Sequence, residues 1–182
     1  MTNERQTVKI KQLDFELLFP ASVIRQRVVE LGKQIEEDYR NNPPIFIGVL
    51  NGAFIFAADL MRAVDLPTSI TFVKFSSYAG MQSTGEVKSL LGLEPAQVKN
   101  RPVIIVEDIV DTGKTLSTFI ENLEKLHPAS IRVAALLLKP DALQYNLKVD
   151  YLGFEIPPAF VIGYGLDYNE EARQLPGIYQ KI

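Results

Sequence analysis

The chain has 182 residues and a mass of 20.4 kDa, enough for one domain with a sizeable core, and 47% hydrophobic residues argue against disorder. Its 19 basic and 22 acidic side chains give a net charge of −3 and a pI near 5.3, which indicates no general attraction to nucleic acid or anionic membranes. Zero cysteines exclude a disulfide framework and thiol catalysis, and a polar N-terminus without long apolar runs predicts neither a signal peptide nor a membrane span. We therefore expect a soluble cytoplasmic protein with a single domain over residues 1–182.

Strand and helix patterns alternate along the first half of the chain without internal repeats, which is typical of an α/β fold. The predicted elements are, in order, a helix at 23–39 capped by Ser22, a strand at 45–50, a helix at 53–64 and a strand at 70–75. Asn51 and Gly52 form the turn between the second and third of these. The following polar segment, 76–86, is rich in Ser, Gly and Thr, and it is interpreted either as a mobile lid or as a hairpin tip.

The stretch Val103–Thr115 reads VIIVEDIVDTGKT and carries the strongest functional signal in the chain. Its first four residues are a continuous β-branched run, the pattern of a strand buried on both faces of a parallel sheet. Glu107 and Asp108 follow at the carboxyl end of this strand, where open α/β sheets bind their ligands. The pattern therefore predicts a ligand site at this edge of the sheet.

The next five residues are predicted to form a turn at the N-terminus of a helix: Asp111, Thr112, Gly113, Lys114 and Thr115. Apolar residues after the turn recur at helical spacing, at positions 116, 119, 120 and 123. Unpaired backbone N–H groups and the positive end of the helix dipole favour an anion there, and the glycine allows close approach. A monophosphate suits such a turn.

The acidic pair Glu107 and Asp108 needs a different partner, because ionised carboxylates repel a phosphate. Carboxylates accept hydrogen bonds and are hard oxygen ligands, so ribose hydroxyls or Mg²⁺ suit them. The stretch as a whole thus predicts a site for a sugar phosphate. A zinc site of the His or Cys type is excluded, because His127 is the only histidine and there is no cysteine.

The second half of the chain adds a strand at 131–138 and a last strand at 160–164, which the Pro157-Pro158 pair precedes. Together with the first half, these elements predict an α/β fold with a central, mainly parallel sheet flanked by helices.

Five segments resemble segments of the type I phosphoribosyltransferase family and occur in the same order as in that family. Their residues are typical of the hypoxanthine-guanine phosphoribosyltransferases. VIIVEDIVDTGKTL resembles the signature for phosphoribosyl pyrophosphate. IGVLNGAFIFAADLMR resembles the family's pyrophosphate loop and following helix, and FSSYAGMQSTGEVK resembles its mobile catalytic loop. VAALLLKP and the segment 150–179 resemble its purine-binding segments. The resemblance implies one domain with a small base-binding hood beside the sheet.

The resemblance also implies roles for individual residues. The residues implied to bind phosphoribosyl pyrophosphate are Glu107, Asp108, Asp111, Thr112, Gly113, Lys114 and Thr115, with Asp111 also catalytic. Those implied to contact pyrophosphate are Leu50, Asn51, Gly52, Ser77, Tyr78 and Arg173. Those on the base side are Lys139, Phe160, Val161 and Asp167, and Mg²⁺ would be held near Glu107, Asp108 and Asp167.

One position departs from the family pattern, since the family usually has a basic residue where this chain has Asn51. The family uses this turn, often through a cis peptide, to present backbone N–H groups to pyrophosphate, and asparagine still allows that. Whether the side chain of Asn51 also contacts pyrophosphate stays open.

The function implied by the resemblance is purine salvage. The enzyme would transfer the 5-phosphoribosyl group from phosphoribosyl pyrophosphate to hypoxanthine and/or guanine, giving IMP or GMP and pyrophosphate, as a homodimer or homotetramer. Asp111 would assist by accepting a proton of the purine. Two alternatives stay open, a xanthine-preferring transferase and a non-catalytic regulator that senses phosphoribosyl pyrophosphate; the sequence does not separate hypoxanthine from guanine.

Overall fold

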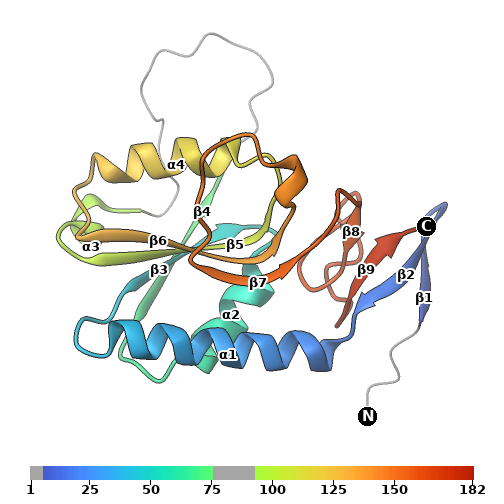
Figure 1. Cartoon of the computed structure of the whole chain (residues 1–182), viewed down its shortest axis with the longest axis horizontal. Coiled ribbons are helices and arrows are strands. Elements are labelled where there is room, and N and C mark those ends of the chain that lie inside the picture. Colours follow the sequence, from blue (N-terminus) through green and yellow to red (C-terminus); the bar gives the residue numbers. More distant parts are fainter. Residues whose placement is uncertain (1–5, 76–92) are drawn as a thin grey trace, which may run out of the picture.

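The computed structural model describes residues 6–75 and 93–182, and these residues form two sheets and their covering helices (Figure 1). In chain order the elements are β1 (Thr7–Ile10), β2 (Leu13–Phe19), α1 (Ala21–Tyr39), β3 (Ile45–Leu50), α2 (Phe54–Ala63), β4 (Ser69–Lys74), α3 (Pro95–Val98), β5 (Pro102–Val110), α4 (Lys114–Glu124), β6 (Ser130–Leu138), η1 (Pro140–Ala142), β7 (Tyr151–Glu155), β8 (Val161–Ile162) and β9 (Ile178–Lys181). The larger sheet has five parallel strands in the order β4-β3-β5-β6-β7. The predicted α/β class with a central parallel sheet is therefore confirmed.

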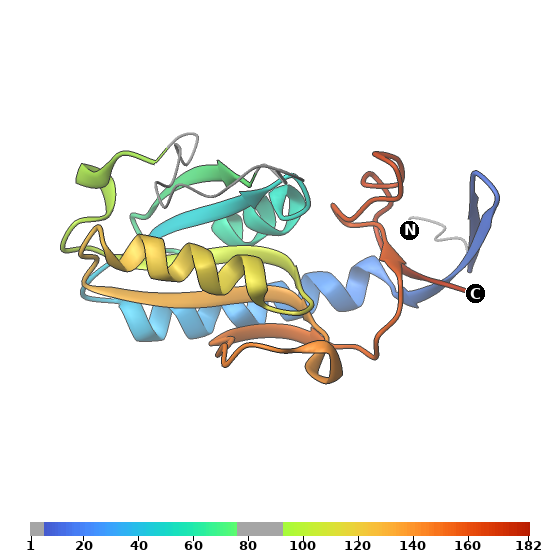
Figure 2. The same ribbon diagram turned by 90° about the horizontal axis from the view of Figure 1, so that it is seen from above.

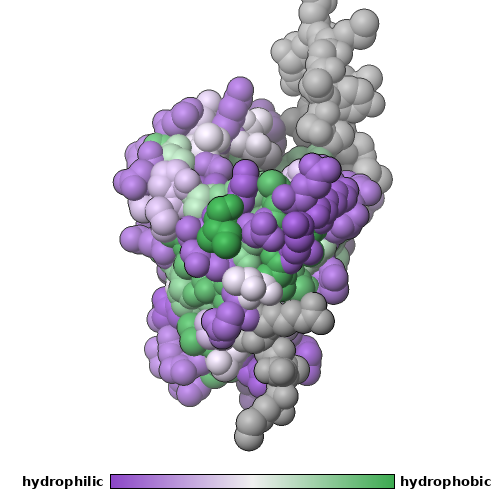
Figure 3. Space-filling view, turned by 90° about the vertical axis from the view of Figure 1, so that its right-hand side faces the viewer, coloured by the Kyte–Doolittle hydropathy of each residue, from purple (hydrophilic) through white to green (hydrophobic). Residues whose placement is uncertain are grey.

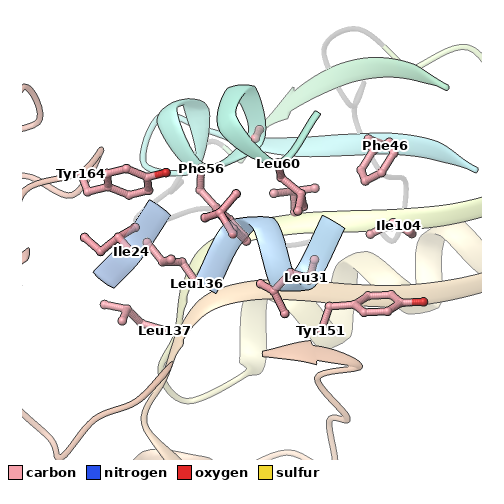
Figure 4. Packing of buried hydrophobic residues seen from close by; sticks show 14 of the residues in the cluster. Ile24, Leu31, Phe46, Phe56, Leu60, Ile104, Leu136, Leu137, Tyr151 and Tyr164 are labelled. Carbon is pink, nitrogen blue, oxygen red and sulfur yellow. The ribbon is translucent and has the colours of Figure 1, made fainter. Parts of the chain in front are cut away.

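Helices cover both faces of the parallel sheet, which explains why its central strands are apolar along their length. The helices α1 and α2 lie on one face, and α4 lies on the other (Figure 1). On the first face, Ile24, Leu31 and Leu60 pack with Ile104 in one buried cluster (Figure 4). Residues of α4 such as Phe119 form a second cluster on the opposite face. Alternate residues of β5 thus serve two cores.

The central strand β5 is longer than the sequence predicted. It continues through Glu107 and Asp108 to Val110 and stays paired with β6 as far as Val110 and Leu138. Its pairing with β3 ends earlier, at Gly48 and Val106. Glu107 and Asp108 therefore belong to β5, and they lie just beyond Val106, the last residue of β5 that pairs with β3.

Two other expectations about local structure were wrong. Pro20, not Ser22, occupies the N-cap position of α1, because the fixed φ of proline suits the extended residue before a helix and Ser22 already lies inside it. The last strand was predicted over 160–164, yet only Val161 and Ile162 are regular. The next three residues have positive φ angles of 94°, 49° and 104°, which turn the chain away from a strand.

The second, smaller sheet stands beside the carboxyl edge of the larger one (Figures 1 and 2). It is antiparallel, with the order β1-β2-β9-β8, so strands from the first residues of the chain pair with strands from the last ones. Its core contains Phe15, Ile162, Ala172 and Tyr179. On the face seen in Figure 3, hydrophilic residues interrupt the hydrophobic surface. We call residues 7–19 and 160–181 the hood.

Within the described part of the chain, none of the helices combines the length and the apolar character required to cross a membrane.

Candidate active site

Most of the predicted site residues lie where the strands of the parallel sheet end. The turn Leu50–Gly52 follows β3, the turn Asp111–Gly113 follows β5, and Lys139 follows β6. Parallel strands point their carboxyl ends to one edge, so these three segments meet at that edge of the sheet. The hood lies alongside the same edge (Figure 2).

The turn before α4 has the geometry of an anion site. Gly113 is the N-cap residue with φ 81°, and a Cβ there would lie 3.0 Å from Leu143 Cδ1, so glycine is required. The Oγ1 of Thr112 accepts the Lys114 N–H at 3.4 Å, and the Thr112 carbonyl accepts the N–H of Gln144 at 3.0 Å. These contacts hold the turn from behind while the N-terminus of α4 stays open to a ligand.

A pocket of about 180 Å³ lies at this turn. Its lining includes Glu107, Ile109 and the run Asp111–Thr115. All the residues predicted to bind the sugar phosphate except Asp108 therefore line one cavity, whose volume suits a small anion.

The two adjacent acids serve different sides of the site. Successive residues of a strand point to opposite faces. Glu107 lines the pocket at the α4 turn, whereas the carboxylate of Asp108 lies against Gly52, where any added Cβ would collide with it. The sequence predicted one shared role for the pair, but the fold gives each carboxylate its own surroundings.

Glu107 has no partner for one of its oxygens: within residues 6–75 and 93–182, its Oε2 is buried without a hydrogen bond. Burial, with a smaller effect from the neighbouring Asp108, raises the pKa of Glu107 well above its ordinary value. Burial thus disfavours the charged form of Glu107, and a cation or a hydrogen-bond donor beside the carboxylate would offset this cost.

Burial also raises the pKa of Asp108, to about 6. Backbone N–H groups, chiefly that of Ile109 at 2.9 Å from Oδ1, oppose this effect, as does the positive charge of Arg173, while Asp167 adds to the rise. Asp108, Asp167 and Arg173 thus act on one another electrostatically although they come from distant parts of the chain.

The predicted catalytic acid and the predicted base-binding lysine are paired with each other. Lys139 Nζ lies 2.9 Å from Asp111 Oδ2. Asp111 is half exposed at 52%, whereas the lysine is largely covered at 13%, so the carboxylate is the accessible member. The N–H of Lys139 also donates to the carbonyl of Val110 at 2.9 Å, which holds the segment after β6 next to the end of β5.

The turn after β3 contains a cis peptide bond between Leu50 and Asn51, the conformation that the resemblance implied for this position. Asn51 is exposed, and Gly52 is enclosed on two sides. Asp108 covers one side, and Gly165 of the hood, with φ 104°, covers the other, where a Cβ on Gly165 would meet the Gly52 carbonyl. Both glycines are needed for this close approach.

The predicted pyrophosphate contact Arg173 lies at the same place. Its guanidinium donates to the Gly165 carbonyl at 2.8 Å and pairs with Asp167 Oδ1, also at 2.8 Å. The other oxygen of Asp167 accepts the N–H of Glu170 at 2.7 Å. Arg173 and Asp167 therefore form one unit with the backbone of the hood, directly behind the turn at Gly52.

Phe160 and Val161 lie in the hood. Phe160 is exposed at 45%, with its ring centroid 6.2 Å from that of Phe15 and 5.8 Å from that of Tyr168. Val161 is buried and pairs with Gln180 across the antiparallel sheet. An exposed aromatic ring held on two buried or half-buried rings is suited to stacking on a planar ligand.

Three carboxylates were predicted to lie near a metal ion. No compact group of His, Cys, Asp or Glu side chains that would form a metal cage occurs within the described ranges, and Asp167 is engaged by Arg173. Glu107 and Asp108 face opposite sides of β5, so each can offer one carboxylate to an ion on its own side. A single carboxylate still fits Mg²⁺, which commonly takes one or two carboxylates and completes its shell with substrate phosphates and water.

Ser77 and Tyr78, predicted to contact pyrophosphate, lie outside the described residues, as does the segment 76–86 predicted to be a lid or a hairpin tip.

Sequence reasoning missed several residues of the site. Gly165 carried a signal, since Gly-Tyr-Gly in an apolar run indicates special backbone angles. Phe15 also carried one, because apolar residues alternate at 13, 15 and 17 as in a half-buried strand. The hydrogen bond from Tyr164 to Asp59, at 2.7 Å, had no sequence signal because 105 positions separate the two residues.

Comparison with known proteins agrees with this geometry. The family model described as "Phosphoribosyl transferase domain" matches residues 20–169. The hypoxanthine-guanine phosphoribosyltransferase of Mycobacterium avium is 42% identical over 178 residues, covering 91% of this chain and 88% of that protein. The hypoxanthine phosphoribosyltransferase of Escherichia coli strain K12 is 41% identical, covering 92% and 95%.

Solved structures are similar over the same extent. The crystal structure of a hypoxanthine-guanine phosphoribosyltransferase from Bacillus anthracis superposes with a TM-score of 0.82 at 34% identity, covering 92% of this chain and 96% of that one. A Trypanosoma cruzi hypoxanthine phosphoribosyltransferase, studied for the role of its C-terminal region, gives a TM-score of 0.84 at 35% identity, covering 96% and 95%.

Proposed function

This chain belongs to the phosphoribosyltransferase family, and from that premise we propose that it transfers the 5-phosphoribosyl group of phosphoribosyl pyrophosphate to hypoxanthine and/or guanine. The products are IMP or GMP and pyrophosphate, which makes the protein a purine salvage enzyme. The observation that carries the proposal is the accessible carboxylate of Asp111, paired with Lys139 at 2.9 Å and located at the first residues of the anion turn.

The phosphate of the substrate binds at the turn. Backbone N–H groups at the start of α4 receive it, with Lys114 and the hydroxyls of Thr112 and Thr115 beside them. The ribose then lies over the pocket lined by Glu107 at the carboxyl end of β5.

The base end of the site holds and deprotonates the purine. Phe160 stacks on the ring, the backbone of Val161 reads its edge, and Lys139 donates to the oxo group at position six. One imidazole nitrogen attacks the anomeric carbon, so a C–N bond forms while the C–O bond breaks and its electron pair leaves with pyrophosphate. Asp111 accepts the proton that the purine loses.

Pyrophosphate leaves toward the turn Leu50–Gly52. The backbone of this turn and the guanidinium of Arg173 face the leaving group, and Ser77 and Tyr78 are proposed to contribute from the segment between β4 and α3. Glu107, Asp108 and Asp167 are the carboxylates proposed to serve Mg²⁺. When bound, the ion neutralises charge that develops on pyrophosphate.

The experiment that tests the proposal is an assay of pyrophosphate release from phosphoribosyl pyrophosphate and Mg²⁺, with hypoxanthine, guanine, xanthine and uracil in parallel. Turnover with one or both 6-oxopurines is expected. Turnover with xanthine alone would reassign the substrate, and tight binding of phosphoribosyl pyrophosphate without turnover on any base would assign the protein as a sensor.

We further propose that residues 1–182 form one domain that functions in the cytoplasm as a homodimer or homotetramer, as the family relationship suggests. Light scattering of the purified protein measures the assembly, and a monomer at working concentration would contradict the proposal.

A further inference from the structure

Tyr164 connects the hood to the helix that follows the pyrophosphate turn. Its hydroxyl donates a hydrogen bond to Asp59 Oδ2 at 2.7 Å, and the residue is only 7% exposed. Tyr164 stands between Gly163 and Gly165, and all three have positive φ angles. This winding of the backbone directs the tyrosine into the interface between α1, α2 and the hood, where Figure 4 shows it above Ile24 and beside Phe56.

The same segment touches the pyrophosphate turn itself. The next residue, Gly165, lies against the carbonyl of Gly52, and the carbonyl of Gly165 accepts the Arg173 guanidinium at 2.8 Å. Asp59 belongs to α2, which begins at Phe54 directly after the turn. The Tyr164–Asp59 bond and the Gly165–Gly52 contact therefore fix the hood segment both to the turn and to the helix that continues it.

Burial and the charge of Asp59 both favour the hydrogen bond that Tyr164 donates to Asp59. Burial raises the pKa of Tyr164 above its ordinary value, and the carboxylate of Asp59 raises it further, so the hydroxyl stays protonated and donates. Asp59 is oriented from its other side by Arg62, whose Nη1 lies 3.7 Å from Oδ1. The bond is partly buried, since the side chain of Asp59 is 42% exposed, and a hydrogen bond to a charged acceptor is stronger than one between neutral groups.

We propose that Tyr164 is a positioning residue for the pyrophosphate end of the active site. It acts through Asp59, holding Gly165 and the Arg173–Asp167 pair in register with the turn at Gly52. This inference rests on the proposed function and adds to it a residue that does not itself touch the substrate. Loosening the bond moves the hood segment away from the turn, so binding of phosphoribosyl pyrophosphate is expected to weaken more than binding of the purine.

The chain contains a matched control in a second tyrosine–aspartate pair. Tyr151 is 3% exposed, and its hydroxyl donates to Asp38 Oδ2 at 2.6 Å. Tyr151 is the first residue of β7, the outer strand of the parallel sheet that follows β6, and it pairs with Ala134 in the middle of β6. Figure 4 shows Tyr164 and Tyr151 at opposite ends of the buried cluster. Removing either hydroxyl breaks a hydrogen bond to an aspartate, and removing that of Tyr151 also breaks the bond that it accepts from Arg132 at 2.6 Å, but only Tyr164 is near the turn.

The test compares Tyr164→Phe with Tyr151→Phe. Both variants are expected to lose stability. Only Tyr164→Phe is expected to raise KM for phosphoribosyl pyrophosphate, by about fivefold, the equivalent of one hydrogen bond, with a smaller change in KM for the purine and in kcat. Asp59→Ala should reproduce this shift, whereas Asp59→Asn keeps an acceptor oxygen and should restore most of the wild-type KM.

Hydrogen exchange gives a readout that does not depend on turnover. The amides of Tyr164 and Gly165 donate to the carbonyls of Leu175 and Arg173, at 2.8 and 3.0 Å, and should exchange faster in Tyr164→Phe but not in Tyr151→Phe. Equal KM values and equal exchange in the two variants would overturn the proposal. Wild-type protein without turnover would instead refute the proposed function, and the exchange comparison would still decide the role of Tyr164.

Discussion

The anion turn Asp111–Gly113 is built from one stretch of chain, whereas the hood joins strands from residues 7–19 to strands near residues 161–181. The turn depends on a strand, a glycine and a helix N-terminus that are neighbours in sequence. The hood depends on the pairing of β2 with β9 and on a core that includes Phe15 and Tyr179. The proposed phosphate site is thus formed by residues that are neighbours in sequence, whereas the proposed base site in the hood depends on contacts between distant segments.

Because the two regions have separate cores, we expect mutations to affect the two ends of the proposed substrate site separately. We expect changes around α4 to act mainly on the proposed phosphate end and changes in the core around Phe15 to act mainly on the proposed base end. The contact of Gly165 with Gly52 is the place where the two regions meet.

The largest expected effect comes from removing a buried aromatic side chain from the core of the hood or from the core beneath α4. Phe15 and Phe119 are both buried, at 0% and 2% exposure, one in the hood and one on α4. Replacing either with alanine is expected to reduce the free energy of unfolding by about 3–5 kcal/mol. Phe15→Ala should raise KM for the purine more than KM for phosphoribosyl pyrophosphate, and Phe119→Ala should do the opposite. Steady-state kinetics and urea denaturation measure both; identical changes in the two KM values would show that the regions are not separable.

Asp111→Asn is expected to lower kcat by roughly 100-fold, because the proton acceptor is lost while the turn is kept. The binding of both substrates should change much less, since the amide still fits beside Lys139. Asp141→Asn, an exposed acid in the nearby η1, is the control and should leave kcat unchanged. A kcat of Asp111→Asn equal to the wild type would remove this residue from the catalytic role.

Asp108→Asn is expected to stabilise the ligand-free protein. Burial raises the pKa of Asp108 from 3.8 to about 6, so between these values the folded protein binds more protons than the unfolded chain. Its stability therefore falls as the pH rises through this window, and at pH 7 the ionised carboxylate costs on the order of 2 kcal/mol.

The asparagine variant removes that cost. Urea denaturation at pH 7.5 should show a gain in unfolding free energy for Asp108→Asn, and at pH 4 the gain should be largely absent. The same variant is expected to lose affinity for phosphoribosyl pyrophosphate. A gain that does not depend on pH would contradict the assignment of the effect to ionisation.

The smallest expected effect comes from replacing the exposed aromatic ring of the hood. Phe160→Ala is expected to raise KM for the purine by about tenfold, in keeping with the loss of one stacking contact. Phe160→Leu keeps apolar area without an aromatic face and should recover only part of the loss. Unchanged purine affinity in Phe160→Ala would refute stacking, and isothermal titration with the purine measures it directly.

The sequence predicted β3, β4, β5 and β6 of the parallel sheet because apolar residues are concentrated in each of these segments, but β7 was absent from the prediction. Ile45–Leu50 was predicted with its observed bounds, and the helix after Gly113 was predicted from a glycine followed by apolar spacing. The extension of β5 to Val110 was not predicted, because acidic residues interrupt its pattern. There the pairing with β6, a tertiary contact, overrides the local preference.

The hood was predicted poorly for the opposite reason. Strands β1, β2 and β9 were absent from the prediction, although Phe15 and Tyr179 form their shared core. The alternation at residues 13, 15 and 17 was an unused signal for β2, but the pairing of β2 with β9, more than a hundred residues away, cannot be inferred from either segment alone. The Lys139–Asp111 pair was not foreseen for the same reason, although each residue was assigned to the site.

The last strand, β9, lies between β2 and β8, and its register with β2 runs as far as Lys181 opposite Phe15. Synthesis proceeds from the N-terminus, so β2 leaves the ribosome early. It cannot pair with β9 until residues 178–181 have been synthesised. The parallel sheet is complete once β7 has emerged. Every strand of the parallel sheet precedes β9 in the chain, so the antiparallel sheet of the hood is completed only after all strands of the parallel sheet have been synthesised.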